Sequence, residues 1–169
     1  MGITILSGPV GAGKTTVARE LVALLPAPVS YIEGDTFWTF VEKAHSADRR
    51  EVFPVIMRAM TAAAIPFART GYEVLIDFSI PPQLLGVARK IVKELPLNYV
   101  ALLPSLALCE ARAASRSRGR VADYANLRDF YALFEAPSPY IVPDDGEAVP
   151  AAIARLIYAE LNKGKFAVA

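Results

Sequence analysis

Short runs of consecutive apolar residues alternate along this chain with longer segments in which apolar positions recur every three or four residues. Unbroken apolar runs are typical of strands buried on both faces of a parallel sheet, and the longer period is typical of the helices that cover such a sheet. The runs predict strands at Ile3–Ser7, Val29–Glu33, Glu73–Phe78, Tyr99–Leu103 and Tyr140–Val142. This alternation predicts a three-layer α/β domain with a five-stranded parallel sheet.

Prolines and capping residues mark the ends of the helical segments. Pro26 ends the first of them, and Pro66 is expected to kink the third. Pro81-Pro82 opens the fourth, because the first turn of a helix needs no N–H partner. The expected helices are Lys14–Leu25, Thr36–His45, Arg49–Thr70, a segment from Pro81-Pro82 to about Leu95, a segment from Ser105 towards Ser117, Asp123–Glu135 and Glu147–Leu161.

Length and composition narrow the classes of function. The 169 residues contain no internal repeat and no long linker, so we expect one domain over residues 1–169. The net charge of +1 argues against a broad surface for nucleic acid, and no apolar run of about 18 residues free of charge and proline predicts a membrane span. The single cysteine, Cys109, fits a reducing compartment. With no leader of basic and then apolar residues, the sequence predicts a cytoplasmic protein and leaves its oligomeric state open.

The stretch GPVGAGKTT, Gly8 to Thr16, carries the clearest chemistry. Glycines allow positive φ angles and bring backbone N–H groups close to phosphate, and the helix that follows adds its positive end. Lys14 is placed to reach the β- and γ-phosphates, and the Thr15 hydroxyl to bind Mg²⁺. The predicted nucleotide-binding residues are Gly8, Pro9, Val10, Gly11, Ala12, Gly13, Lys14, Thr15 and Thr16.

With this motif between a buried strand and a helix, the chain resembles the P-loop NTPases. Within them it is similar to the small-molecule kinases related to gluconate, shikimate and adenylylsulfate kinases and to chloramphenicol phosphotransferase. The resemblance implies a sheet of order 2-3-1-4-5, ATP with Mg²⁺, and a helical lid at about residues 112–123. The segment Asp77 to Pro81 differs from that of gluconate kinases, and the third predicted strand looks more like that of chloramphenicol phosphotransferases and zeta-toxin-like kinases.

Two acidic residues follow predicted strands, whose carboxyl ends line the ligand crevice in sheets of this type. Asp35 corresponds to an acid that contacts the acceptor hydroxyl in the related kinases, where a carboxylate orients the hydroxyl and takes its proton. The alternative role of Asp35 is to cap a helix starting at Thr36. Asp77 resembles the Walker B carboxylate that holds Mg²⁺, with a turn-forming residue at a strand end as the alternative.

Four arginines lie within nine residues, at Arg112, Arg116, Arg118 and Arg120. Like charges so close together favour a bound anion nearby, and three of them share a helix face if the helix continues. The resemblance implies that they belong to the lid, with Arg112 contacting adenine and Arg116 and Arg120 stabilising the charge of the transition state. A solvated basic helix face or a nucleic-acid patch is the alternative.

The acceptor is expected next to Asp35, where the sequence reads Thr36-Phe37-Trp38-Thr39-Phe40. Phe37 and Trp38 suggest a partly apolar or ring-bearing substrate, with core packing as the alternative. Arg49, Arg50 and Arg58 are candidate contacts for an anionic acceptor, whereas His45 is more typical of a surface residue in a loop.

The sequence therefore predicts an ATP-dependent kinase that transfers the γ-phosphoryl group to a hydroxyl of a small molecule. A nucleotide-dependent switch or weak NTPase acting through a protein partner is one alternative, although no GTPase-type motif for base recognition is present. A kinase of nucleic-acid ends is another, and the near-neutral charge argues against it. The identity of the acceptor does not follow from the sequence.

Overall fold

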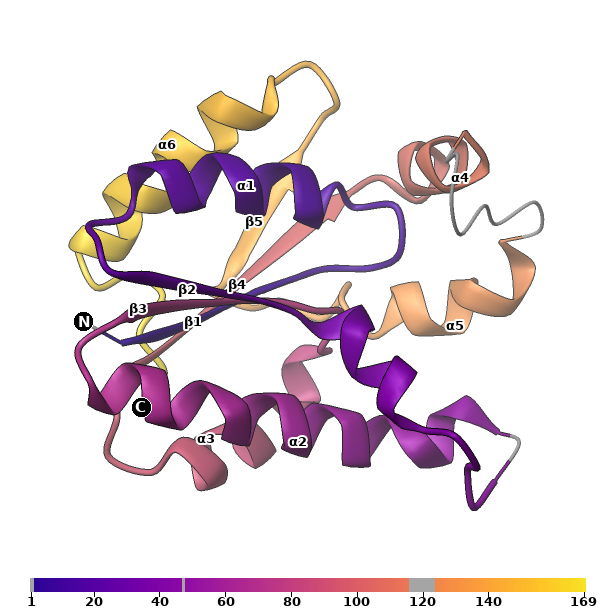
Figure 1. Ribbon diagram of the computed structural model, residues 1–169. Coiled ribbons are helices and arrows are strands. Elements are labelled where there is room, and N and C mark those ends of the chain that lie inside the picture. Colours follow the sequence, from indigo (N-terminus) through magenta and orange to yellow (C-terminus); the bar gives the residue numbers. More distant parts are fainter. Residues whose placement is uncertain (1, 47, 116–123) are drawn as a thin grey trace.

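A computed structural model describes residues 2–46, 48–115 and 124–169 of the chain. Its centre is a parallel sheet of five strands in the order β2-β3-β1-β4-β5, which confirms the predicted sheet and its order (Figure 1). The strands are β1 (Ile3–Ser7), β2 (Val29–Glu33), β3 (Glu73–Asp77), β4 (Leu97–Pro104) and β5 (Ile141–Asp144).

Helices cover both faces of this sheet, as Figure 1 shows. On one face, α1 (Lys14–Leu24) packs against α6 (Pro150–Asn162), and on the other α2 (Arg49–Arg69) packs against α3 (Leu85–Val92). Two further helices, α4 (Leu106–Ala114) and α5 (Ala125–Ala132), lie beyond the carboxyl ends of the strands. Those ends and these two helices enclose the region where the functional residues gather.

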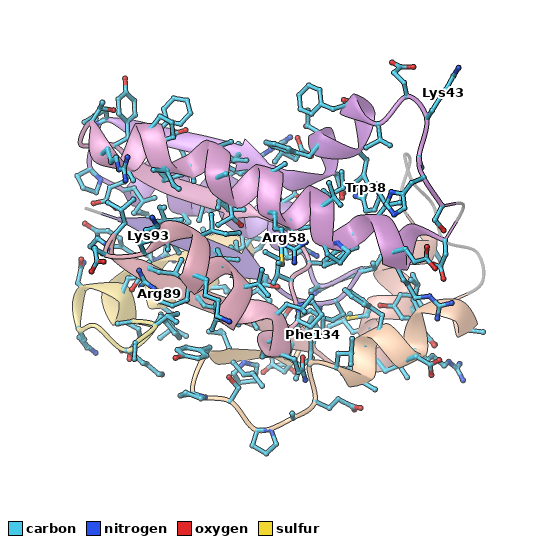
Figure 2. All side chains as sticks on the ribbon, turned by 90° about the horizontal axis from the view of Figure 1, so that it is seen from below. Trp38, Lys43, Arg58, Arg89, Lys93 and Phe134 are labelled. Atoms are coloured by element: carbon cyan, nitrogen blue, oxygen red, sulfur yellow. The ribbon has the colours of Figure 1, made fainter. Side chains whose placement is uncertain are left out.

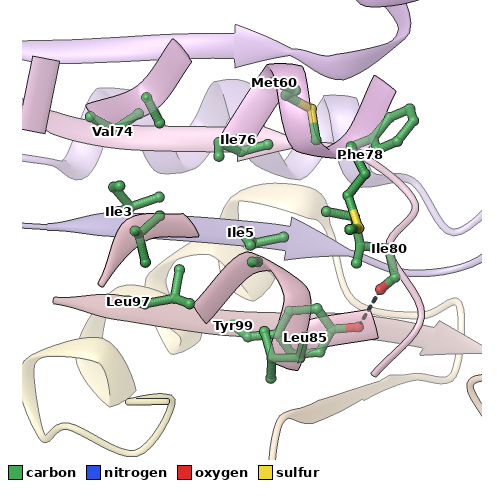
Figure 3. Close-up of a cluster of buried hydrophobic side chains, with 14 of the residues drawn as sticks. Ile3, Ile5, Met60, Val74, Ile76, Phe78, Ile80, Leu85, Leu97 and Tyr99 are labelled. Atoms are coloured by element: carbon green, nitrogen blue, oxygen red, sulfur yellow. Dashed lines mark hydrogen bonds between the residues drawn. The ribbon is translucent and has the colours of Figure 1, made fainter. Parts of the chain in front are cut away.

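The apolar strands alternate their side chains between two cores. Ile3 and Ile5 face the core under α2 and α3, whereas Leu6 belongs to the core under α1 and α6. Figure 3 shows the first of these cores, in which Ile76 and Tyr99 lie beside the β1 side chains. Because helices cover both faces of the sheet, side chains of the central strand β1 are buried on both of its faces, and each fully buried isoleucine contributes roughly 1.5–3 kcal/mol.

Register brings specific residues to one edge of the sheet. Leu6 of β1 pairs with Asp77 of β3, and Glu33 of β2 pairs with the same Asp77. The phosphate-binding motif after β1, the segment after β2 and the acid that ends β3 therefore meet at the same edge.

The segment predicted as a helix over Thr36–His45 is instead a 3₁₀ helix, η1 (Gly34–Phe40). Its aromatic and β-branched residues are weak α-helix formers, and the tighter 3₁₀ turn is used in short pieces. The Thr39 hydroxyl donates to the Thr36 carbonyl at 2.7 Å, which closes one of these turns.

Other element boundaries differ from expectation by a few residues. The fourth helical segment begins with a 3₁₀ turn, η2 (Pro82–Leu84), and α3 ends at Val92 because Lys93 takes a positive φ of 53°. α2 continues past Pro66 to Arg69, and α6 starts at Pro150 rather than Glu147, with proline in the first turn, where its missing N–H costs nothing.

Within the described residues, α2 contains one stretch, Arg50–Arg69, that is long and apolar enough to cross a membrane by length and composition alone. Ile56, Met60 and Ala64 on its inner face are buried against the sheet. A helix that forms part of a protein core can have the same length and apolar composition, so this stretch is weak support for a membrane span.

Candidate active site

A cleft with a volume of about 1310 Å³ opens at the carboxyl ends of the strands. The phosphate-binding motif lines one end of it, and we call this end the donor half. We call the other end, beyond Asp35 and Asp77, the acceptor half. Pockets for a single small ligand usually measure about 300–1,000 Å³, so this cleft has room for more than one molecule.

The backbone of the motif has the shape of an anion cradle. Gly8, Gly11 and Gly13 all have positive φ angles, of 140°, 88° and 85°. A Cβ atom at Gly11 would collide with the Cys109 carbonyl oxygen, so glycine is required there by both conformation and space. The chain enters α1 directly after Gly13, so the positive end of this helix faces the phosphate position.

Lys14 lies against this loop. Its Nζ donates to the Pro9 carbonyl oxygen at 3.0 Å, which holds the ammonium over the backbone of the motif. A single flexible cation placed there can transfer its bonds to phosphate oxygens when a nucleotide binds.

The predicted magnesium residues are in contact. The Thr15 hydroxyl donates to Asp77 Oδ2 at 2.7 Å, and Asp77 is only 4% exposed. The hydroxyl of Tyr31, from the edge strand β2, donates to the same oxygen at 3.0 Å. Burial, together with the Asp77 carboxylate, raises the pKa of Tyr31, which keeps this phenol protonated and donating.

These oxygen ligands suit Mg²⁺, which takes one or two protein oxygens and completes its shell with water and phosphate. The described residues contain no cluster of three or more histidine, cysteine or acidic side chains that would form a full protein cage. Thr15 and Asp77 therefore fit a metal that arrives with a nucleotide.

Tyr31→Phe removes one hydrogen-bond donor to Asp77. We expect this variant to need a roughly 3- to 10-fold higher Mg²⁺ concentration for half-maximal nucleotide binding, because partners that orient metal-binding carboxylates tune metal affinity. Titration of Mn²⁺ by electron paramagnetic resonance in the presence of ADP measures this directly. Tyr158→Phe, at a half-buried tyrosine of α6, is the matched control. Equal metal affinity in Tyr31→Phe and the parent protein would contradict a role for Tyr31.

Asp35 lies inside the first turn of η1, is exposed and lines the cleft. Its alternative role as the cap of a helix starting at Thr36 is not what the structure shows, because η1 begins at Gly34 and no side chain caps it. A Cβ at Gly34 would lie 2.5 Å from the Phe78 ring and 2.6 Å from Met60 Sδ. Glycine thus lets η1 approach the end of β3, which sets Asp35 over the cleft.

Arg112 is tied to the donor half. Its Nη1 donates to Asp144 Oδ2 at 2.7 Å, and Asp144, at the end of β5, is only 6% exposed. The same guanidinium nitrogen lies 3.7 Å from the position that a Cβ of Gly13 would take. The sequence did not identify Asp144 as the partner of Arg112, although an acid at a strand end was a signal already used for Asp77.

The remaining lid arginines, Arg116, Arg118 and Arg120, lie outside the described part of the chain. Their assignment to transition-state charge, like that of Arg112 to adenine, stays a prediction.

The predicted acceptor residues divide into two groups. Asp35 and Trp38 line the cleft, whereas Phe37 lines a separate, smaller hollow and packs edge-on against Phe40 at 5.5 Å. Arg58 is exposed on the α2–α3 side of the molecule, which Figure 2 views, and is not among the described residues that line the cleft. The structure therefore offers no support for Phe37 or Arg58 as acceptor contacts.

Arg50, one of the arginines suggested for an anionic acceptor, lines the acceptor half. Further lining residues, which the sequence did not single out for the acceptor, are Glu33, Phe53, Phe78, Ser79, Pro81, Leu84, Leu127, Phe130 and Leu133. They come from β2, α2, the loop after β3, η2 and α5, and no local pattern relates them.

The loop after β3 that supplies part of this lining is fixed from below by a buried network. The Ile80 carbonyl accepts from the Ser7 hydroxyl at 2.7 Å and from the Tyr99 hydroxyl at 2.6 Å, and the second bond is drawn in Figure 3. The Ile80 N–H donates back to Ser7 Oγ at 2.8 Å. Burial raises the pKa of Tyr99, so the phenol remains a donor.

Tyr99→Phe is expected to lower the free energy of unfolding by about 1–2 kcal/mol, because a buried carbonyl loses one donor while Ser7 still serves it. Urea unfolding followed by far-UV circular dichroism measures the change. Tyr158→Phe, which removes a hydroxyl outside this network, should change stability by less than about 0.5 kcal/mol. Equal losses in the two variants would contradict the anchoring role of Tyr99.

A family model described as AAA domain matches residues 3–137. The chain belongs to this AAA-domain family. The match covers the phosphate-binding motif, Asp35, Asp77 and Arg112, and it confirms the prediction of a P-loop NTPase. No curated protein matches the chain.

Solved structures share the fold over nearly the whole chain. A Janibacter sugar kinase is 19% identical with a TM-score of 0.73, and the match covers 96% of this chain and 95% of that one. A Sinorhizobium meliloti gluconokinase is 18% identical with a TM-score of 0.67, and the match covers 97% of this chain and 93% of that one. A Mycobacterium tuberculosis APS kinase in complex with AMPPNP and APS is 20% identical with a TM-score of 0.70, and the match covers 95% of this chain and 98% of that one. At these identities the comparisons show a shared fold, that of the P-loop small-molecule kinases.

Proposed function

We propose that this AAA-domain protein is an ATP-dependent phosphotransferase that moves the γ-phosphoryl group to a hydroxyl of a small-molecule acceptor. The observation that carries the proposal is that one cleft contains the phosphate cradle, the Thr15–Asp77 pair and the carboxylate of Asp35. A cleft larger than a single ligand usually needs also suits two substrates.

The donor half binds and orients the nucleotide. The N–H groups at the start of α1 and the ammonium of Lys14 hold the β- and γ-phosphates. Thr15 and Asp77 hold Mg²⁺, which supplies charge stabilisation to the phosphates when it is bound. Arg112, which pairs with Asp144 next to the motif, supplies a further cation to the nucleotide.

The acceptor half positions the hydroxyl. Asp35 accepts a hydrogen bond from the acceptor O–H and takes its proton as the oxygen forms a bond to the γ-phosphorus. The bond between that phosphorus and the β–γ bridging oxygen breaks, and ADP leaves. Lys14, Arg116 and Arg120 offset the negative charge that moves between the two oxygens.

The test is ATP turnover with and without candidate acceptors, followed by mass spectrometry of the acceptor pool. ADP formation that depends on an acceptor, with a product heavier by one phosphoryl group, supports the proposal. Hydrolysis at the same rate without any acceptor would instead favour a switch or NTPase, and dependence on oligonucleotides would favour a kinase of nucleic-acid ends.

A further inference from the structure

The acceptor half of the cleft is walled by aromatic side chains from four separate segments. Trp38 comes from η1, Phe53 from α2, Phe78 from the loop after β3, and Phe130 from α5. Four large rings from distant parts of the chain, all lining the same half of one cleft, form a surface for an apolar body rather than for a fully hydroxylated one.

Three of these rings pack on one another. Phe53 stacks on Phe78 with centroids 5.3 Å apart and planes 14° apart, and Phe130 meets Phe53 edge-on at 6.4 Å and 69°. Phe78 is buried in the core at 4% exposure, whereas Phe53 and Phe130 are half-buried. The wall is therefore anchored on one side and accessible from the cleft on the other.

Aliphatic side chains extend this surface. Leu84 and Leu127 are half-buried in the lining, and Leu133 is 42% exposed. An exposed leucine at the edge of an apolar cleft gains stabilisation when a ligand covers it.

The charges in this half are mainly negative. Glu33 and Asp35 are exposed carboxylates that line it. Among the lining side chains that the structure describes here, Arg50 carries the positive charge; it is 92% exposed and lies 3.1 Å from Asp48 Oδ2.

The other described cations of the cleft belong to the donor half. Lys14 lies on the Pro9 carbonyl, and Arg112 is paired with Asp144. An anionic group on the acceptor would thus lose water next to two carboxylates and the bound nucleotide's phosphates, with no buried cation in the described lining to compensate.

Resting on the proposed function, we propose that the acceptor is an alcohol on an apolar, ring-bearing body that carries no negative charge. The hydroxyl reaches Asp35, the rings lie against Trp38 and the Phe53–Phe78–Phe130 wall, and a positively charged substituent is accepted next to Glu33. The charges of the described lining residues disfavour sugar acids and phosphorylated alcohols.

Trp38 supplies a direct assay, because it is the single tryptophan of the chain and lines the acceptor half. Its fluorescence is followed while a ligand is added in the presence of Mg²⁺ and a non-hydrolysable ATP analogue. The ligands are three biphenylmethanols that carry a hydrogen, an aminomethyl group or a carboxylate at the same position of the far ring. Gluconate is the fourth ligand. The neutral and aminomethyl compounds are expected to bind at least 10-fold more tightly than the carboxylate and gluconate. Equal or tighter binding of either anion overturns the inference.

Variants locate the binding. Phe53→Ala is expected to weaken the neutral probe about 10-fold, and Leu133→Ser, at an exposed position where folding is less at risk, about 3-fold, both with unchanged nucleotide affinity. Glu33→Gln should narrow the gap between the neutral and carboxylate probes. No change in any of the three variants would also overturn the inference.

Phosphoryl transfer, followed separately, distinguishes the two proposals. Aromatic alcohols that bind but never become phosphorylated would refute the phosphotransferase and leave the ligand class standing. An anionic acceptor that is phosphorylated faster than every neutral or cationic one would refute the ligand class and leave the phosphotransferase standing.

Discussion

Asp35→Asn is expected to bind Mg-ATP as tightly as the parent protein and to transfer phosphoryl at least 100-fold more slowly. Asparagine keeps the size and polarity of the side chain but does not take the acceptor proton, and a positioned general base contributes about 10²–10⁴-fold. Because Asp35 is exposed, its replacement should leave the fold intact. Isothermal titration with an ATP analogue and acceptor-dependent ADP release measure the two quantities separately.

The matched control for this variant is Glu94→Gln. Glu94 is an exposed carboxylate on the turn before β4, at the opposite end of the sheet from the cleft. Its neutralisation should change neither nucleotide affinity nor turnover. If Asp35→Asn transfers phosphoryl at the parent rate, then Asp35 is not the base, whatever the reaction.

Asp77→Asn is expected to lose at least 100-fold in Mg²⁺-dependent turnover, a larger effect on metal use than that of Tyr31→Phe. The carboxylate is buried and already accepts from Thr15 and Tyr31, so it is preorganised to hold the metal that stabilises phosphate charge. Nucleotide affinity measured in EDTA should change little, since the cradle N–H groups and Lys14 remain.

The isosteric amide still accepts both hydroxyl hydrogen bonds, so thermal unfolding should confirm that Asp77→Asn is folded. Glu94→Gln again serves as the control. A variant with normal turnover at the same Mg²⁺ concentration would remove Asp77 from the metal site and leave its buried hydroxyl contacts as a structural feature only.

The parts of this protein that were predictable from sequence are those with local signals. Short continuous apolar runs bounded by turn residues are typical of covered parallel strands, and the glycine pattern of the phosphate cradle suits positive φ angles that few other residues adopt. Parallel register then brings Asp77, at the end of β3, beside the end of β1, and the phosphate-binding loop leads from there to Thr15 in the first turn of α1.

What the sequence did not reveal depends on contacts between distant segments. Tyr31 reaches Asp77 across β2 and β3, and Arg112 finds Asp144 across α4 and β5. The aromatic lining of the acceptor half combines residues as far apart in the sequence as Trp38 and Phe130, which no periodicity connects. Of the arginines suggested for an anionic acceptor, Arg50 lines the cleft and Arg58 does not. Eight helical residues carry Arg58 about 12 Å further along α2 and turn its side chain by about 80°.

Transfer of the γ-phosphoryl group itself tests the central claim most directly. The protein is incubated with Mg-ATP labelled in its γ-phosphoryl oxygens and with a pool of neutral, cationic and anionic alcohols, and all products are resolved by mass spectrometry. We expect one or a few alcohols to gain the labelled phosphoryl group with the parent protein and with Glu94→Gln, and we expect Asp35→Asn not to form this product. Label that appears only in inorganic phosphate, at a rate that no added alcohol changes, would contradict this expectation.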